Sequence, residues 1–310
     1  MKRVYFLLSL FFLSLVLNAQ DIQFAMPYSS PLYFNPAFAG SSGCGRVTGE
    51  YRNQWPNISG NYISSILSID QYIKKIHGGF GINYFHDGAG LGTVRNNRIS
   101  GIYSFRIPLF KNKCIIQSAI EGGYAQRTLD WSKLTFGSPQ NGFVYGDKLK
   151  EVVSYPDFSS GILIYSEKFY GGFAIHHLNE PEESILYNES RLPKQYTAHA
   201  GANIRFKNSG KEITLSPSLL YFQQQNYRNL ALSCAAQRGL LVLGLRYRND
   251  DNMIGSIGFR VKSFRIAYSY DLTISKLGIV AAGSHELSLS VFFNRKNVPS
   301  EFLPFETAAF

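Results

Sequence analysis

The sequence is poor in cysteine and tryptophan and, after its first 19 residues, contains no long apolar run. Its three cysteines, Cys44, Cys114 and Cys234, are odd in number and far apart, so they imply no disulfide framework. Because no later run reaches about 18 apolar residues, an ordinary transmembrane helix is excluded. No Cys/His spacing indicates a metal site and no Gly-Lys-Ser/Thr phosphate loop occurs, so we expect neither metal nor cofactor.

Residues 1–19 have the composition of a secretory signal peptide. Lys2 and Arg3 precede an apolar core over 4–17, and the small residue Ala19 provides a cleavage position. The formal net charge of +10 falls to +8 once Lys2 and Arg3 are removed. The remaining basic residues lie in scattered turns rather than in one patch, which argues against nucleic acid as a partner.

Apolar and polar residues alternate along most of the remaining chain. In residues 98–107, for example, Tyr103 and Phe105 share one face while Arg98 and Arg106 share the other. In lipid only a helix or a closed barrel satisfies every backbone donor and acceptor, so alternation in an exported chain predicts an outer-membrane β-barrel. The expected strands cover 46–55, 60–70, 78–86, 95–107, 113–127, 156–166, 169–178, 194–206, 212–223, 227–237, 240–249, 252–260, 263–272 and 284–294. The predicted fold is thus all-β: a transmembrane antiparallel β-barrel of 14 strands.

The lengths of the connections support the barrel. The long ones, 128–155, 179–193 and 273–283, all follow odd-numbered strands, whereas short ones beside Lys111 and Lys207 follow even-numbered strands. Outer-membrane barrels have short periplasmic turns and longer outer loops. A secreted soluble β-protein, the alternative, has no reason to sort its loops in this way.

Residues 20–45 lack periodicity and form an expected irregular segment before a barrel over 46–294, with a tail over 295–310. The segment contains Asn35-Pro36-Ala37-Phe38-Ala39-Gly40, and Pro and Gly allow it a shaped, non-regular backbone. Either it is a simple tether to the first strand, or it is a plug at or inside the periplasmic mouth. We favour the plug, because a barrel of 14 strands has room inside.

Four stretches, in the same order along the chain, carry a resemblance to a known family. They are 20–24 with 32–40, 156–161 continuing through 169–172 to 176–181, 215–218, and 268–272 with 283–287. Together they resemble the PorP/SprF outer-membrane proteins of the type IX secretion and gliding system of Bacteroidetes. The resemblance implies an integral outer-membrane barrel beside the secretion machinery, needed for export or surface retention of an adhesin-like protein with a C-terminal sorting domain. We have no family role for Cys44.

Two groups of residues are candidates for a site. The pair His176 and His177 lies in the stretch that includes Asn179 and Pro181. Neighbours in a strand point to opposite faces, so we expect one imidazole in the lumen, the other near the outer interface, and a structural rather than catalytic role for the motif. No other constellation suggests an enzyme.

The second group lies in two predicted outer loops, which we expect to dock a secreted partner. These residues are Trp131, Phe136, Phe143 and Tyr145 in 128–155, and Glu182 and Glu183 in 179–193. Packing of the loop on itself is an equal alternative for the aromatic residues. The main functional hypothesis is therefore a non-enzymatic partner for a secreted protein, and the runner-up is a channel or transporter for a small, possibly apolar, solute.

Overall fold

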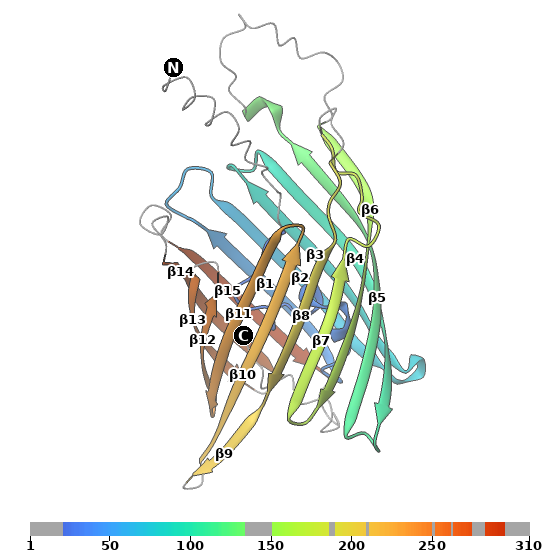
Figure 1. The fold of residues 1–310 in the computed structure, drawn as a ribbon, viewed down its shortest axis with the longest axis vertical. Helices are drawn as coiled ribbons and strands as arrows, with labels where there is room; N and C mark the ends of the chain where they lie inside the picture. The colour runs from blue at the N-terminus through green and yellow to red at the C-terminus, as the bar shows by residue number, and fades with distance from the viewer. Residues whose placement is uncertain are drawn as a thin grey trace, which may run out of the picture.

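The protein is one antiparallel sheet closed into a barrel (Figure 1). The computed structural model describes residues 21–133, 151–185, 190–208, 211–249, 252–261, 263–274 and 283–294. The first strands are β1 (Gly45–Gln54), β2 (Tyr62–Ile73), β3 (Gly78–Ala89), β4 (Val94–Leu109), β5 (Cys114–Leu129), β6 (Val152–Ser166) and β7 (Phe169–His176). The others are β8 (Gln195–Ala202), β9 (Ile204–Asn208), β10 (Lys211–Gln224), β11 (Tyr227–Arg238), β12 (Leu241–Arg248), β13 (Asn252–Val261), β14 (Phe264–Thr273) and β15 (Ser284–Phe293).

The 15 segments form 14 strands, because β8 and β9 are halves of one strand. Both pair with β10, in one register that continues from Gly201↔Ser218 to Ile204↔Leu215. The break falls opposite Pro217, which has no N–H to donate to the ladder. Pairing of β1 with β15, beginning at Gly45↔Phe293, closes the barrel. The predicted strand number is confirmed.

The two ends of the barrel differ in their connections. Segments 130–151, 177–194 and 274–283 all lie at one end, which we call the long-loop end. The opposite, short-turn end has connections such as 110–113 and 167–168. The sorting of long connections to one end is confirmed. Short helices contribute little to either end: η2 spans Lys74–Ile76 and η3 spans Trp131–Lys133.

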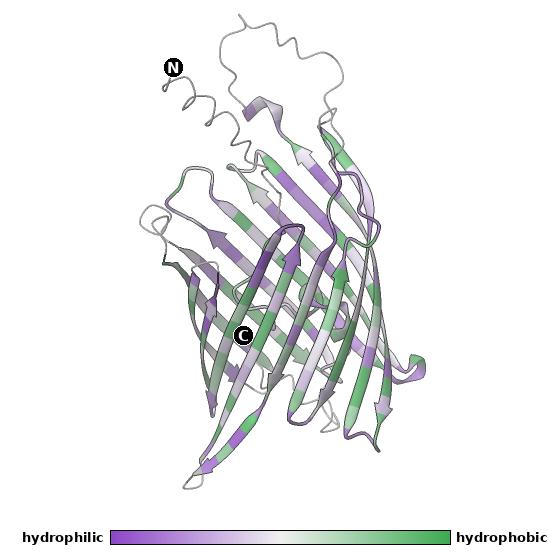
Figure 2. Ribbon diagram, viewed as in Figure 1, coloured by the Kyte–Doolittle hydropathy of each residue, from purple (hydrophilic) through white to green (hydrophobic). Residues whose placement is uncertain are grey.

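Hydrophobic and hydrophilic residues alternate along strands of the wall (Figure 2), and the apolar ones are exposed on the outer face while the polar ones are buried on the inner face. Ile266 is 41% exposed on the outside, whereas its neighbour Arg265 is 6% exposed and faces inward. Tyr103 and Phe105 are likewise outward, as predicted. None of the described helices is long and apolar enough to cross a membrane.

Exposed aromatic residues form two bands on the outer face, as in other transmembrane barrels. Near the long-loop end stand Tyr51, Tyr62, Tyr124, Phe158 and Tyr247, and near the short-turn end stand Phe80, Phe105, Phe169, Phe259 and Phe264. Between these bands the outward residues are mainly aliphatic. The bands mark the two interfaces of the membrane.

Two strand prolines lie where a strand has a neighbour on one side only. Pairing of β4 with β3 stops at Phe105, and Pro108 lies beyond it. Pairing of β6 with β7 stops at Ser160, and Pro156 lies beyond it. The N–H groups of Arg106 and Phe158, each two residues from a proline, point to the side where the neighbouring strand is missing. A proline N–H would point to the same side, so its absence costs no ladder hydrogen bond.

Candidate functional site: the filled lumen

The N-terminal segment, residues 21–44, lies inside the barrel and runs along its length. Its first residue, Asp21, contacts Gln224 and His177 at the long-loop end. Its last part reaches the short-turn end, where β1 begins. The segment is buried almost throughout and includes two short helices, α2 (Pro31–Phe34) and η1 (Pro36–Phe38). The sequence predicted a plug at or inside the periplasmic mouth rather than a simple tether; the segment does lie inside the barrel, and it extends from one end of the lumen to the other.

Asn35 fits a socket made by two strand glycines. Its amide nitrogen donates to the carbonyls of Ile162 and Phe173, at 3.2 and 3.4 Å, and its oxygen accepts from the N–H of Ala37 at 2.9 Å. A Cβ on Gly161 of β6 would lie 2.1 Å from Asn35 Oδ1, and a Cβ on Gly172 of β7 would lie 3.0 Å from Asn35 Nδ2. Only glycine leaves room for this side chain.

Pro36 and Phe38 pack the segment against an apolar part of the wall. Pro36 begins η1, where its missing N–H costs nothing, and it is buried. Phe38 is 1% exposed and stacks on His199, with ring centroids 5.5 Å apart. The apolar cluster around it includes Ile115, Leu163, Tyr165 and Tyr170 from β5, β6 and β7. Burial of these side chains fixes the middle of the segment against one side of the barrel.

Gly40 brings the segment backbone into contact with the wall backbone. It has φ +73°, and a Cβ there would lie 2.7 Å from the Cα of Gly79 in β3. Its N–H donates to Asp70 at 2.7 Å, and Asp70 is paired with Arg46 at 2.8 Å. The close approach and the left-handed backbone both require glycine at this position.

The opposite side of the lumen holds the segment through charged side chains. Glu286 of β15 accepts the N–H groups of Ala25 and Met26, both at 2.7 Å. Arg52 of β1 lies 3.1 Å from Glu286 and 2.9 Å from Asp271. The carboxylate that binds the segment is therefore itself paired with an arginine, as a buried charge requires.

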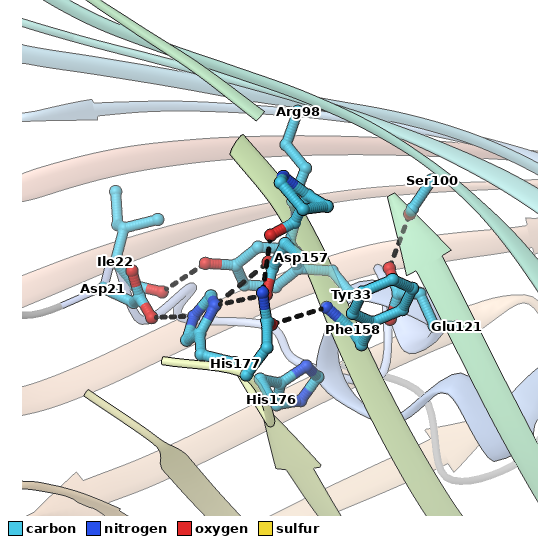
Figure 3. A network of polar contacts seen from close by, with 12 residues as sticks. Asp21, Ile22, Tyr33, Arg98, Ser100, Glu121, Asp157, Phe158, His176 and His177 are labelled. Carbon is cyan, nitrogen blue, oxygen red and sulfur yellow. Dashed lines mark hydrogen bonds and ion pairs between the residues drawn. The ribbon is translucent and has the colours of Figure 1, made fainter. Parts of the chain in front are cut away.

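A chain of four charged residues joins the beginning of the segment to the wall (Figure 3). Nε2 of His177 lies 2.7 Å from Asp21, and Nδ1 lies 3.0 Å from Asp157 of β6. Asp157 in turn accepts from Arg98 of β4 at 3.0 Å. Tyr33 closes the group within the segment by donating to the carbonyl of Ile22 at 3.0 Å. The network links Asp21, at the start of the segment, through His177 to Asp157 of β6 and Arg98 of β4.

The expectation that His176 and His177 point to opposite faces was wrong. Both are buried, at 2% and 3% exposure, and their ring centroids are 6.4 Å apart. β7 ends at His176, and His177 has φ +57°, so the alternation of a strand no longer applies to it. His176 contacts the carbonyl of Phe34 at 3.3 Å, so both imidazoles hold the N-terminal segment.

His177 follows β7 and Asp21 precedes the first strand, so both lie outside the membrane-spanning strands. Burial lowers the pKa of His177, but the carboxylates of Asp21 and Asp157 outweigh it and raise this pKa to about 9. Burial raises the pKa of Asp21, but the adjacent His177 outweighs this effect and lowers it. The two groups are therefore an ion pair at neutral pH.

Asn179 and Pro181 complete the end of β6 rather than form a ligand site. The Asn179 side chain accepts from the N–H of Phe158 at 3.2 Å and donates to the carbonyl of Pro156 at 2.8 Å. The Asn179 side chain thereby supplies hydrogen bonds to the backbone of β6 that a neighbouring strand would supply if β7 continued. Pro181 is buried and its carbonyl accepts the N–H of Leu192 at 2.9 Å, which brings residues 181–185 beside 190–192.

The predicted docking residues are only partly covered by the structure. Trp131 lies in η3 and is partly exposed, whereas Phe136, Phe143 and Tyr145 lie outside the described residues. Glu182 is exposed beside Arg191, with which it forms an isolated bridge. Glu183 is instead buried, 2.8 Å from Arg127. Of the two glutamates, only Glu182 faces solvent.

Between the segment and the wall, the long-loop end retains a small polar cavity of about 80 Å³, lined by Asp21, Asp87, Asn96, Arg98 and His177 among others. The described residues contain no group of three or more His, Cys, Asp or Glu side chains that could hold a metal ion. Sequence reasoning missed Asp21, Arg98, Asp157 and Glu286 as residues that hold the segment, because they are far apart in the chain. Arg98, Asp157 and Glu286 shared an inward position in the alternation, whereas Asp21 precedes the alternating part of the chain.

Comparison with known proteins identifies one family. The model of the family described as "Type IX secretion system membrane protein PorP/SprF" matches residues 16–291. Of the four stretches that carried the resemblance, the first belongs to the N-terminal segment in the lumen, and the other three lie in the strands of the wall or directly beside them. A search of the curated proteins finds none that matches this chain.

Solved barrels are similar to this chain at low identity. The Acinetobacter baumannii outer membrane protein Omp33 is 6% identical with a TM-score of 0.44, covering 81% of this chain and 98% of its own. The KdgM porin, solved in complex with oligogalacturonate, is 8% identical with a TM-score of 0.40, covering 80% and 99%. A deletion mutant of TodX, a monoaromatic hydrocarbon channel, is 9% identical with a TM-score of 0.43, covering 84% and 92%.

Proposed function

The chain belongs to the PorP/SprF family of type IX secretion system membrane proteins, and from this membership we propose that it docks one secreted protein at the cell surface. The family is not known to be enzymatic. The barrel is a fixed platform in the outer membrane, and its partner is an adhesin-like protein with a C-terminal sorting domain. Other components of the secretion system lie beside it.

The observation that carries the proposal is the filled lumen. Residues 21–44 are held by the Asn35 socket, by the Gly40–Gly79 contact and by the ion pair of Asp21 with His177. Passage of a polypeptide through the barrel would break all of these contacts at once. Retention on the outer surface needs none of them to break, and it is therefore the role that fits the geometry best.

The alternative is a channel or transporter for a small solute. Three cavities beside the segment measure about 80, 20 and 20 Å³, whereas ligand pockets for drug-sized molecules usually exceed about 300 Å³. A solute path would therefore require displacement of the N-terminal segment. We rank this alternative below docking.

The proposed docking surface is the long-loop end. It consists of the connection after β5, which carries Trp131, and of the exposed side of 179–193 with Glu182. β5 extends to Leu129 and β6 begins at Val152, so the connection can be shortened only within 130–151. Aromatic anchors among charges are what interfaces use for affinity and for steering.

The test is replacement of 134–150 by a short Gly/Ser turn, which leaves η3 and both strands intact. We expect a folded barrel that still migrates heat-modifiably on gels but no longer retains the secreted partner on intact cells. The matched control replaces 275–280, at the same end of the barrel, and should retain the partner. Normal retention by the first variant would exclude this surface.

A further inference from the structure

A large cavity lies at the short-turn end, apart from the proposed docking surface. Its volume is about 610 Å³, and it lies between the β4–β5 turn and the β6–β7 turn. Its floor is formed by Ile115 and Tyr165, both buried in the apolar cluster that packs on the N-terminal segment. The cavity thus combines the size of a ligand pocket with an apolar base.

The rim of the cavity is positively charged. Lys111 and Lys113 come from one turn and Lys168 from the other, and all three are exposed. Glu167 is the one acidic side chain among the lining residues. Phe169, 65% exposed, forms one side. An occupant that fits this lining carries carboxylates beside aromatic or aliphatic side chains.

The floor is also connected to the segment in the lumen. The Tyr165 hydroxyl donates to Gln117 Oε1 at 3.2 Å, and the Gln117 amide donates to the carbonyl of Ala39 at 2.5 Å. Ser104 donates to the same carbonyl at 2.7 Å. An occupant that covers Tyr165 therefore lies directly below the point where the segment is fixed to the wall.

The chain itself supplies a matching sequence. β15 ends at Phe293 at this same short-turn end, and residues 295–310 follow it, outside the described part of the chain. After Lys296 the tail contains no basic residue, but it contains Glu301 and Glu306 and three phenylalanines, Phe302, Phe305 and Phe310. Its charge and its apolar content are complementary to the rim and to the floor.

The distance permits the contact. The cavity lies about six strands from β15 around the barrel, which is about 30 Å along the rim at the usual strand spacing. Glu306 is 13 residues beyond Phe293, a span that reaches up to about 43 Å when extended. The route across the mouth is shorter than the route along the rim.

We propose that residues 302–310 of the same chain occupy this cavity, with Glu306 against the three lysines and phenylalanine side chains against the exposed Phe169. This inference does not depend on docking of a secreted partner at the opposite end.

The test places photoreactive benzoylphenylalanine at position 305 of the full-length protein, purified in detergent micelles. After irradiation, mass spectrometry should find adducts within the same chain on peptides that contain Ile115, Tyr165 or Phe169. The combined variant Lys111→Glu, Lys113→Glu and Lys168→Glu should lower the yield about fivefold, as expected for loss of partly exposed ion pairs. Adding Glu306→Lys should raise it again.

The matched control is Lys74→Glu, Lys75→Glu and Lys207→Glu, which reverses three charges at the same end but outside the cavity lining. It should leave the yield unchanged, and heat-modifiable migration checks that every variant is folded. Adducts with detergent, with another part of the barrel or with a second, isotope-labelled copy would overturn the proposal. An equal loss in the control would also overturn it, since general charge would then explain the effect.

Discussion

The Oδ2 atom of Asp21 lies 2.7 Å from Nε2 of His177, although 156 residues separate them in the sequence. Asp21 begins the N-terminal segment inside the barrel, and His177 follows β7 at the long-loop end. Because Asp157 and Arg98 continue the network, the ion pair attaches the start of the segment to the wall. The attachment depends on protonation, which makes it testable.

The first prediction concerns pH. The pKa of His177 is raised to about 9, above its usual value of about 6.5, so its stabilisation is complete below about pH 6.5 and is lost as pH rises through about 9. The pKa of Asp21 is lowered, so its contribution is lost only in acid. A nitroxide on Gln23→Cys, with the native cysteines replaced, should become mobile between pH 8 and 10.

The control for this prediction is His177→Gln. The label should then be mobile at neutral pH already and should not respond between pH 8 and 10. His285→Gln, on the outer face beside Tyr268, should behave like the parent protein. A label whose mobility in the parent does not change over this pH range would show that the ion pair does not hold the segment.

The second prediction concerns the Asn35 socket. Asn35→Ala removes three hydrogen bonds, and Gly161→Ala places a methyl group 2.1 Å from the position of Asn35 Oδ1. Each should lower the free energy of unfolding by about 1–3 kcal/mol, measured by urea titration in lipid vesicles. The double variant should cost less than the sum, because the methyl group then has space.

Gly101→Ala is the matched control, since a Cβ at this outward glycine of β4 has no neighbour within 4 Å. It should change the stability little. Additive costs for Asn35→Ala and Gly161→Ala would contradict the socket, because two residues that do not share a contact add independently.

The third prediction concerns the wall. Ile257 of β13 is 42% exposed on the outer face, and its neighbour Ser256 faces the lumen beside a small cavity. Ile257→Arg should destabilise the barrel by about 2–4 kcal/mol in lipid vesicles, the usual cost of arginine near the bilayer centre. Ser256→Arg should cost clearly less. Ala267 is unsuitable as the inward control, because it packs against Met26 of the segment. Equal costs would reverse the assignment of the two faces.

The fourth prediction concerns orientation. Ser132 is exposed at the long-loop end and Lys207 is exposed at the short-turn end. In a variant without native cysteines, an impermeant maleimide should label Ser132→Cys on intact cells. Lys207→Cys should be labelled only after the outer membrane is permeabilised. The reverse pattern would place the long loops in the periplasm.

Much of the barrel could be predicted because its rule is local. Alternation with a period of two determined which residues of each strand face outward, and Ile266 and Arg265 follow it. The merging of β8 with β9 was also implicit in one expected strand over 194–206. The exception was His177, since the end of β7 and a left-handed backbone turned it inward beside His176. A residue pattern does not reveal where a strand stops.

By itself the sequence determined the 14 strands and the sorting of loop lengths, because each depends on neighbours in the chain, whereas the export signal over 1–19 stays a prediction. Only the tertiary structure decided that residues 21–44 run through the whole lumen, with Asn35 between Gly161 and Gly172 and with Asp21 beside His177. These contacts join residues more than 100 positions apart, and their formation depends on closure of the sheet. The sheet closes because lipid does not tolerate unpaired strand edges. The local pattern therefore builds a barrel, and the closed barrel creates the interior that the N-terminal segment fills.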